Sequence, residues 1–309
     1  MAMSKEGFYM QKIAAIINFC SNEFPYLKAC IEHLQPLCVQ IIVPVCDHFF
    51  DGKKEDLSTL SKIYSSFPRV KFVQYPHLGK KFSKKTFKKN GGRIFDGVSR
   101  FLGACHVDSE IDYILFIDAD EIVDPTRFKQ WQKSFPLHEY QALKFENYWY
   151  FREEKYRAKT TENSILLVEK KSLSKKVLFG PDDRDGIYKR IQGKKEKNIF
   201  DTEQKPFFHH YSWVRTKEQM IRKVQSWGHR HERDWKSLVE EEFSRPFNGK
   251  DFVHGYEFIT TKPFITLNLE EKPLDKPKIT LSNLIKLSEK KALKSLSFFL
   301  WLRSCFIRA

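Results

Sequence analysis

The sequence predicts an α/β fold in which a mostly parallel central sheet is covered by helices. Over the first 125 residues, short apolar segments typical of buried strands alternate with segments whose apolar residues recur at helical spacing. The chain has 309 residues, of which 41% are hydrophobic and 15% aromatic, so it can bury a large core. Both observations favour one large domain, alone or with a small appendage.

The expected elements of the first half follow one another regularly. Each apolar segment is short and ends in polar residues, as buried strands do. The expected strands are 12–19, 40–45, 70–75 and 113–117, and the expected helices between them are 24–37, 57–67 and 94–105. Because ligands of such sheets bind at the carboxyl ends of the strands, polar residues there are the first candidates for a site.

The pattern changes after residue 125. We expect a helix at 125–133, mixed strands at 142–151 and 164–169, a loop-rich charged stretch at 170–197, a strand at 205–214 and a helix over 216–243. Thr216 and Gln219 have the spacing of a capping box, which predicts where the last of these helices begins. We assign residues 1–243 to the main domain and 244–309 to an extended linker followed by a basic amphipathic helix over 281–307.

The formal net charge of +15 bears on partners and not on the fold. It fits nucleic acid, an anionic membrane face or a phosphorylated small molecule, and equally a basic soluble protein. The basic last helix fits a membrane interface or packing on the domain. The six cysteines form no CxxC or zinc spacing, and the sequence shows neither an apolar signal segment nor a spanning run. Reduced thiols and a cytoplasmic location are expected.

Asp118 and Asp120, followed by Glu121, stand directly after the most apolar expected strand. Carboxylates at positions i and i+2 of a tight turn can face one cleft and chelate a hard divalent cation, Mg²⁺ or Mn²⁺, which bridges diphosphate oxygens. The alternative is a solvated loop in which an Asp caps the next helix. The position at the end of the fourth strand favours the metal site.

With this motif in place, the chain resembles the GT-A glycosyltransferases, and most of all the family 2 type. The resemblance covers residues 12 to about 230 and rests on Ser21-Asn22-Glu23, on Gly91-Gly92-Arg93 and on LFIDADEIV over 115–123. It implies a GT-A catalytic domain and a nucleotide-sugar donor, for which a UDP-sugar is favoured.

The resemblance also implies roles for single residues. Asn22, Glu23 and Asp47 match positions that contact the nucleotide base and ribose. Arg93 matches a position near the uridine and diphosphate, and Asp118 is expected to serve the nucleotide as well as the metal. The stretch after Asp47 lacks the family's usual Gly-Ser-x-Asp.

A histidine beyond the central strands often completes the metal coordination in GT-A enzymes. His209 and His210 lie in the strand expected at 205–214, and neutral imidazole ligates such cations. Because side chains alternate across a strand, only one of the two can face the metal, and the sequence does not say which. The alternative is one core and one exposed histidine. His229 and His231, two apart on a helix, share no face and are not expected to bind a metal.

Inverting transfer needs a carboxylate that takes the proton of the acceptor hydroxyl. The family keeps this base at about the distance of the acidic turn 180–186, which offers Asp182, Asp183 and Asp185. The alternative is an ordinary Pro-Asp-Gly turn. Glu146 is a further candidate. The lysine-rich loop 79–92 is either solvated or captures a phosphate group.

We therefore expect a metal-dependent, hexosyltransferase-type glycosyltransferase that inverts the anomeric centre. Its acceptor would be an anionic glycan or a lipid-linked glycan, met in the cytoplasm or at the inner face of the membrane, and Arg215, Arg222 and Arg230 could contact phosphate or acceptor. A nucleotidyltransferase is the first alternative, since it shares the sheet and the carboxylates but releases pyrophosphate. A nucleic-acid-binding module would also explain the charge, but no RRM, KH or zinc pattern supports it.

Overall fold

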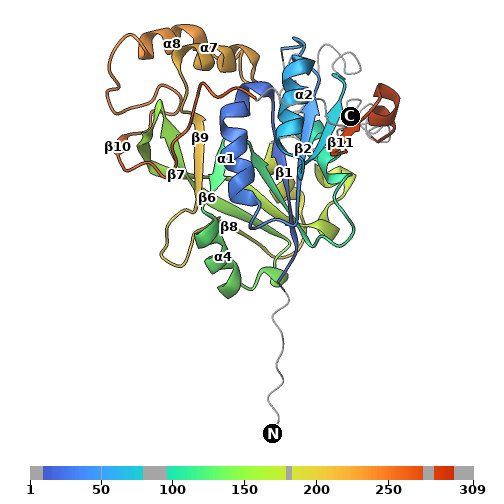
Figure 1. The fold of residues 1–309 in the computed structure, drawn as a ribbon. Coiled ribbons are helices and arrows are strands. Elements are labelled where there is room, and N and C mark those ends of the chain that lie inside the picture. The colour runs from blue at the N-terminus through green and yellow to red at the C-terminus, as the bar shows by residue number, and fades with distance from the viewer. Residues whose placement is uncertain (1–9, 50, 79–95, 179–182, 274–281, 296–309) are drawn as a thin grey trace, which may run out of the picture.

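The computed structural model describes residues 10–49, 51–78, 96–178, 183–273 and 282–295. These residues form one eleven-stranded sheet with helices packed against it (Figure 1). The strand order is β11-β3-β2-β1-β4-β7-β6-β9-β5, with β10 paired to β7 and β8 paired to β6. The predicted α/β class with a central sheet is confirmed.

The first half of the sheet is parallel. It consists of β1 (Ile13–Asn18), β2 (Gln40–Cys46), β3 (Lys71–Tyr75), β4 (Tyr113–Asp118) and β11 (Leu284–Lys286). The connecting helices are α1 (Phe24–Leu34), α2 (Leu57–Ser66) and a helix at 96–104, and the short 3₁₀ turn η1 (Ser21–Glu23) precedes α1. Because helices cover both faces, the central strands β1, β2 and β4 are apolar along almost their whole length. In the register of β1 and β4, Asn18 lies opposite Asp118, so both strands end at the same edge.

The second half of the sheet is mixed. It adds β5 (Glu121–Val123), β6 (Ala142–Phe151), β7 (Glu153–Glu169), β8 (Lys195–Ile199), β9 (Phe208–Trp213) and β10 (Phe258–Thr260). The long strand β7 runs antiparallel to both β4 and β6, and β9 runs parallel to β6 and antiparallel to β5. The turn at Asp118 to Asp120 therefore leads from the parallel half directly into β5 and its neighbour β9.

Three apolar clusters hold the layers together. One face of the sheet packs against α1, α2 and α4 (Pro125–Ser134), and the other packs against the helix at 96–104 and α6 (Asp183–Arg190). A third cluster joins the ends of β6 and β9 to α7 (Lys217–Ser226) and α8 (Trp235–Glu242), which lie at one end of the molecule (Figure 1).

Three details of the prediction are corrected. The capping box at Thr216 is present, but α7 ends at Ser226 and α8 begins after the cap Asp234, so one expected helix is two. The loop-rich stretch 170–197 contains η4 (Lys170–Ser172), α5 (Lys175–Leu178), α6 and the start of β8. Residues 284–286 of the expected last helix form β11, because the edge of β3 offers unpaired backbone groups; helix follows at 289–295, and 296–309 lie outside the described residues.

The segment after residue 243 therefore contributes β10 and β11 to the sheet, while the domain boundary at 243 stays a prediction. None of the helices formed by the described residues is long and apolar enough to cross a bilayer.

Asn283 fixes β11 to the sheet and allows a test of this attachment. Its side-chain amide donates to the carbonyls of Tyr64, Phe67 and Val70 at 3.0–3.2 Å. We expect Asn283→Ala to lower the free energy of unfolding by about 1–3 kcal/mol, and Asn283→Asp to lower it further, because a carboxylate oxygen would face three carbonyl oxygens. Denaturant titration followed by circular dichroism measures both changes. Asn248→Ala, in an exposed turn, is the control, and equal effects at 248 and 283 would contradict the attachment.

Candidate active site

The turn after β4 is held by hydrogen bonds from its backbone amides to β1 and to the Glu121 side chain. The Ala119 amide donates to the Asn18 carbonyl at 3.0 Å, and the Asp118 amide donates to the Glu121 carboxylate at 2.8 Å. These bonds close the turn between β4 and β5 at the carboxyl ends of the parallel strands. Asp118 and Asp120 consequently stand at the edge where ligands of such sheets bind.

A cavity of about 520 Å³ opens at this edge. One end of it is formed by the ends of β1 to β4 and by the helix at 96–104, and the other by β6, β9, α7, α8 and the loop that follows α8. The predicted site residues on its wall are Asn22, Glu23, Asp118, Asp120, Asp183 and His210. Asp47, Asp185 and His209 are not on the wall, and Arg93 and Asp182 lie outside the described residues.

Asp118 is held by two arginines. Arg100 donates to Oδ1 at 3.2 Å and Arg184 donates to Oδ2 at 3.0 Å, while 32% of the Asp118 side chain stays exposed. Burial raises the pKa of Asp118 to about 6, and the two guanidinium groups only partly offset this rise. Each carboxylate oxygen thus already has a cationic partner from a distant segment.

Glu121 is the most deeply buried acid of the motif. Its side chain is 0% exposed, and it accepts two hydrogen bonds from Arg184, at 2.6 and 3.0 Å, and one from Ser164 at 2.6 Å. Burial alone would raise the pKa of Glu121, but Arg184 and its other partners lower it below the usual value. Arg184 therefore joins α6 to the turn through Glu121 and Asp118 together.

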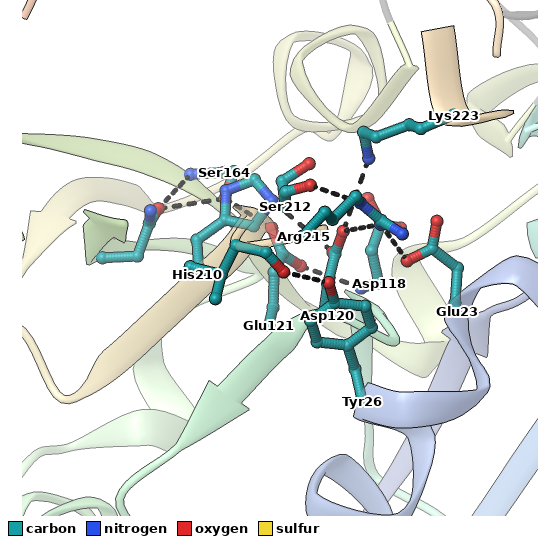
Figure 2. Close-up of polar contacts among 12 residues, drawn as sticks. Glu23, Tyr26, Asp118, Asp120, Glu121, Ser164, His210, Ser212, Arg215 and Lys223 are labelled. Carbon is teal, nitrogen blue, oxygen red and sulfur yellow. Dashed lines mark hydrogen bonds and ion pairs between the residues drawn. The ribbon is translucent and has the colours of Figure 1, made fainter. Parts of the chain in front are cut away.

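Asp120 lies among one histidine and two cationic side chains (Figure 2). His210 Nε2, Arg215 Nη2 and Lys223 Nζ lie 3.5, 3.6 and 3.7 Å from its oxygens. Burial would raise the pKa of Asp120, yet Lys223, His210 and Arg215 together hold it well below its usual range. Asp120 is thus an ionised carboxylate on the cavity wall, and its cations stand beyond ordinary hydrogen-bond distance.

The two adjacent histidines face opposite sides of β9. His210 pairs with Glu121 in the sheet and lines the cavity, whereas His209 pairs with Ile122 and points into the core. The His209 ring lies 3.9 Å from that of Phe264 in a parallel stack and shares a 2.8 Å hydrogen bond with the Tyr150 hydroxyl. Of the two histidines that the sequence left open, His210 is the one placed beside Asp120.

Burial and neighbouring charges shift the pKa values of the two histidines in opposite directions. Burial lowers the pKa of His209 well below 6.5, and no carboxylate offsets it. Burial acts likewise on His210, but Asp120 and Glu121 outweigh it and raise the pKa of His210 above 6.5.

The acidic turn expected at 180–186 is in part a helix, because α6 begins at Asp183. Asp183 lies on the cavity wall, has a left-handed backbone (φ 45°) and accepts a 2.9 Å hydrogen bond from Arg100. Its other oxygen, Oδ1, is buried and has no hydrogen-bond partner among the residues that the structure describes. Asp185 is 57% exposed and pairs with Lys144 away from the wall. Glu146 accepts from Asn163 and does not line the cavity either.

The positions expected to bind the nucleotide are only partly together. Asn22 and Glu23, in η1, lie on the wall next to Arg215, which donates to Glu23 at 2.6 Å. Asp47 instead accepts from the His77 amide at 2.7 Å and pairs with His48, so it holds a neighbouring loop. Arg215, expected near phosphate, is almost fully buried behind Asp120.

Several residues of the site were not predicted as site residues. Arg100, Arg184 and Lys223 supply cations to the motif, and four tryptophans line the far end of the cavity: Trp149, Trp213, Trp227 and Trp235. A signal for Lys223 existed, because it shares the buried face of α7 with Met220 and Val224, where a lysine needs an acidic partner.

The metal site fits in part. Among the described residues, no group of three or more His, Cys, Asp or Glu side chains is placed to hold a metal ion. Asp118 has both oxygens engaged by arginines. Asp120 and His210 remain as two adjacent donors at the wall, and a hard cation bound with a diphosphate needs few protein ligands beside phosphate and water. The donor set therefore fits a cation shared with the substrate.

The pair Arg184–Glu121 is expected to dominate the stability of the site. Arg184→Met leaves Glu121 buried without its cation and should lower the free energy of unfolding by about 3–5 kcal/mol. The double variant Arg184→Met/Glu121→Gln should recover part of this loss, because no buried charge is then left unpaired. Denaturant titration measures the cycle. Lys144→Met is the control, because Asp185, the partner of Lys144, is exposed, and this change should cost about 1 kcal/mol or less. An equal loss of stability in Arg184→Met and Lys144→Met would refute the assignment.

The histidines give a pH test with opposite signs. Only the unfolded state takes a proton at His209 below about pH 6.5, so stability is lost there on acidification, by up to about 1.4 kcal/mol per pH unit. His209→Phe should therefore lose less melting temperature than the wild type between pH 7 and pH 5. Protonated His210 stabilises the fold at low pH, and this contribution fades as the pH rises, so His210→Phe should lose more over the same interval. Identical pH profiles for the two variants would count against the opposite orientations.

Comparisons with known proteins give distant likenesses only. No protein-family model and no curated protein matches the chain. Among solved structures, a 4-diphosphocytidyl-2C-methyl-D-erythritol synthase from Anaerococcus prevotii is 12% identical (TM-score 0.40; 63% of this chain and 95% of that chain). The galactosyltransferase LgtC with donor and acceptor sugar analogues is 10% identical (TM-score 0.39; 76% and 98%). Glucosyl-3-phosphoglycerate synthase from Mycobacterium tuberculosis, with Mn²⁺, UDP and phosphoglyceric acid, is 12% identical (TM-score 0.38; 85% and 89%). At these scores the function has to be argued from the site itself.

Proposed function

We propose that this chain is a GT-A-type glycosyltransferase that moves a sugar from a nucleotide-diphosphate-sugar to an acceptor hydroxyl. The observation that carries the proposal is the setting of Asp120: an ionised carboxylate at the carboxyl edge of the sheet, on a cavity wall, with the His210 imidazole 3.5 Å away and the cations of Arg215 and Lys223 3.6–3.7 Å away. A cavity of about 520 Å³ suits a ligand of nucleotide-sugar size.

Glycosyl transfer develops negative charge on the departing diphosphate, and groups that stabilise this charge lower the barrier. Lys223 is suited to this role. Its side chain is about nine-tenths buried, it lines the cavity, and its ammonium lies 3.7 Å from Asp120. The ammonium can therefore donate to a phosphate oxygen that enters beside Asp120.

Asp120 and His210 would hold a divalent cation, Mg²⁺ or Mn²⁺, together with the diphosphate. When bound, such an ion supplies Lewis-acid stabilisation of the phosphate oxygens. Asp118 has a different task in this proposal: with Arg100, Arg184 and Glu121 it keeps the turn in place and leaves Asp120 on the wall.

Asp183 is the base that we propose for the acceptor hydroxyl. It is the described residue of the predicted acidic set that lies on the wall. Arg100 fixes one of its oxygens, and the other, Oδ1, has no partner in the described part of the chain. A base that takes the proton during direct attack at the anomeric carbon gives inversion of configuration.

We also propose the nucleotide, the acceptor and the location. Asn22 and Glu23, on the wall beside η1, would meet the nucleotide, and UDP is favoured. A glycan or lipid-linked acceptor is proposed; that it is anionic, and that the protein works in the cytoplasm or against the inner membrane face, are predictions from the net charge of +15. Nucleic acid is not expected as a partner.

Ligand-induced stabilisation tests the proposal. A UDP-sugar at about 100 times its Kd should add about 2.7 kcal/mol, a rise of several degrees in melting temperature, and Mn²⁺ should increase the effect. Asp120→Asn should lose the Mn²⁺-dependent part, because it removes a ligand of the cation. Lys223→Met should lose most of the remainder, because it removes the cationic side chain that donates to the diphosphate.

Differential scanning fluorimetry with UDP-, GDP- and CMP-sugars, each with and without Mn²⁺, measures the shifts relative to every variant's own baseline. Glu203→Gln, an exposed change away from the cavity, is the matched control. Shifts in Asp120→Asn that equal those of the wild type would refute the site. Release of pyrophosphate instead of a nucleoside diphosphate would identify a nucleotidyltransferase.

A further inference from the structure

Four tryptophans gather at the end of the cavity opposite the parallel strands. Trp149 comes from β6, Trp213 from the end of β9, and Trp227 and Trp235 from the two sides of the turn between α7 and α8. This aromatic end begins beside the charged centre, because the Trp149 ring lies 4.9 Å from that of His210, and His210 lies 3.5 Å from Asp120.

Two neighbouring tryptophans hold the indole ring of Trp227 in place. Its ring centre is 5.4 Å from that of Trp213 and 5.1 Å from that of Trp235, with interplanar angles of 87° and 77°. Trp213 and Trp235 are buried, whereas Trp227 is partly exposed on the cavity wall. Edge-to-face contacts of this kind fix the orientation of an indole without covering it by a parallel ring.

Two indole N–H groups at this end have no hydrogen-bond partner among the described residues. They belong to Trp149 and Trp227, whose Nε1 atoms are buried, and the whole Trp149 residue is only 4% exposed. Trp235 differs, since its Nε1 donates to the His229 carbonyl at 2.9 Å. Buried donors without partners are rare in folded proteins, and on a cavity wall they point to acceptor atoms of a ligand.

The charged side chains of the aromatic end are already engaged. Arg233 donates to the carbonyls of Phe252 and Val253 and lies over the Trp235 ring, and Glu232 pairs with His229 at 2.5 Å. Besides the partly exposed side chains of Glu232 and His254, the described wall offers a ligand flat apolar surface and N–H donors here. An uncharged pyranose matches both, because its C–H face packs on an indole and its hydroxyl oxygens accept from N–H groups.

We propose that this end binds an uncharged sugar ring of the acceptor glycan, with Trp227 as the stacking surface and the N–H groups of Trp149 and Trp227 as donors to its hydroxyls. The inference rests on the proposed function in assigning this sugar to the acceptor, because the sugar would lie next to the centre from which the diphosphate departs. It replaces the anionic acceptor expected from net charge with a neutral one at this position.

The test uses the full-length chain and neutral methyl glycosides of glucose, galactose and mannose. Glycoside binding is measured by saturation-transfer NMR without nucleotide. The KM values of donor and acceptor are measured with the nucleotide-sugar that the thermal-shift screen identifies. Trp227→Phe, which keeps a ring and loses the N–H, should weaken glycoside binding about five-fold, and Trp227→Ala about twenty-fold. Trp149→Phe should weaken it about five-fold as well. In the Trp227 variants, the KM of the donor and its hydrolysis without acceptor should stay unchanged.

Trp131→Phe is the matched control, because Trp131 stacks on Phe135 in the core and not on the cavity wall. Unchanged glycoside binding in all Trp149 and Trp227 variants would overturn the inference, and so would a rise in donor KM in place of acceptor KM. Binding of sugar phosphates or uronic acids in preference to neutral glycosides would overturn it too. Since the NMR arm needs no nucleotide, a failure of donor binding in the wild type would strike the proposed function separately.

Discussion

The pairing of buried charge is the constraint on which the site depends. Three carboxylates leave the end of a fully apolar strand within four residues, and a carboxylate buried without a partner costs several kcal/mol. Each finds its cation in a distant segment: Arg184 for Glu121, Arg100 for Asp118, and Arg215 with Lys223 for Asp120. The helix at 96–104, α6 and α7 are thereby tied to one turn, so the packing of these helices and the shape of the cavity are set together.

Much of the parallel half could be predicted from the sequence, because buried parallel strands are apolar over their whole length and leave a local signal. The place of Asp118 and Asp120 followed from the same signal. Strand β11 could not be predicted in this way: it has three residues, and its position depends on the free edge of β3 and on the hydrogen bonds of Asn283. The break between α7 and α8 was likewise hidden, since apolar spacing continues across it while the backbone does not.

The sequence could predict the candidate site only where the position of a residue in the chain determines the direction of its side chain. Strand alternation required His209 and His210 to face opposite ways, but the choice between them depended on the pairing of β9 with β5, which is a tertiary fact. The same holds for the acidic residues near 183: their numbers in the chain say nothing of which one Arg100 would hold on the wall. Trp149 and Trp227, 78 positions apart, share the cavity wall only because β6 ends beside α7.

The net charge of the chain and the charge of the site have opposite signs. Six carboxylates lie on the described wall, those of Glu23, Asp96, Asp118, Asp120, Asp183 and Glu232, against the two cations Lys223 and Arg233. The +15 excess therefore lies mainly away from the cavity. An entering diphosphate would meet an acidic wall, and Arg100, Arg184 and Arg215 are committed to carboxylates. Binding of a polyanion here consequently needs cations that can still turn toward the ligand, which are the Lys223 ammonium and an ion shared with Asp120 and His210.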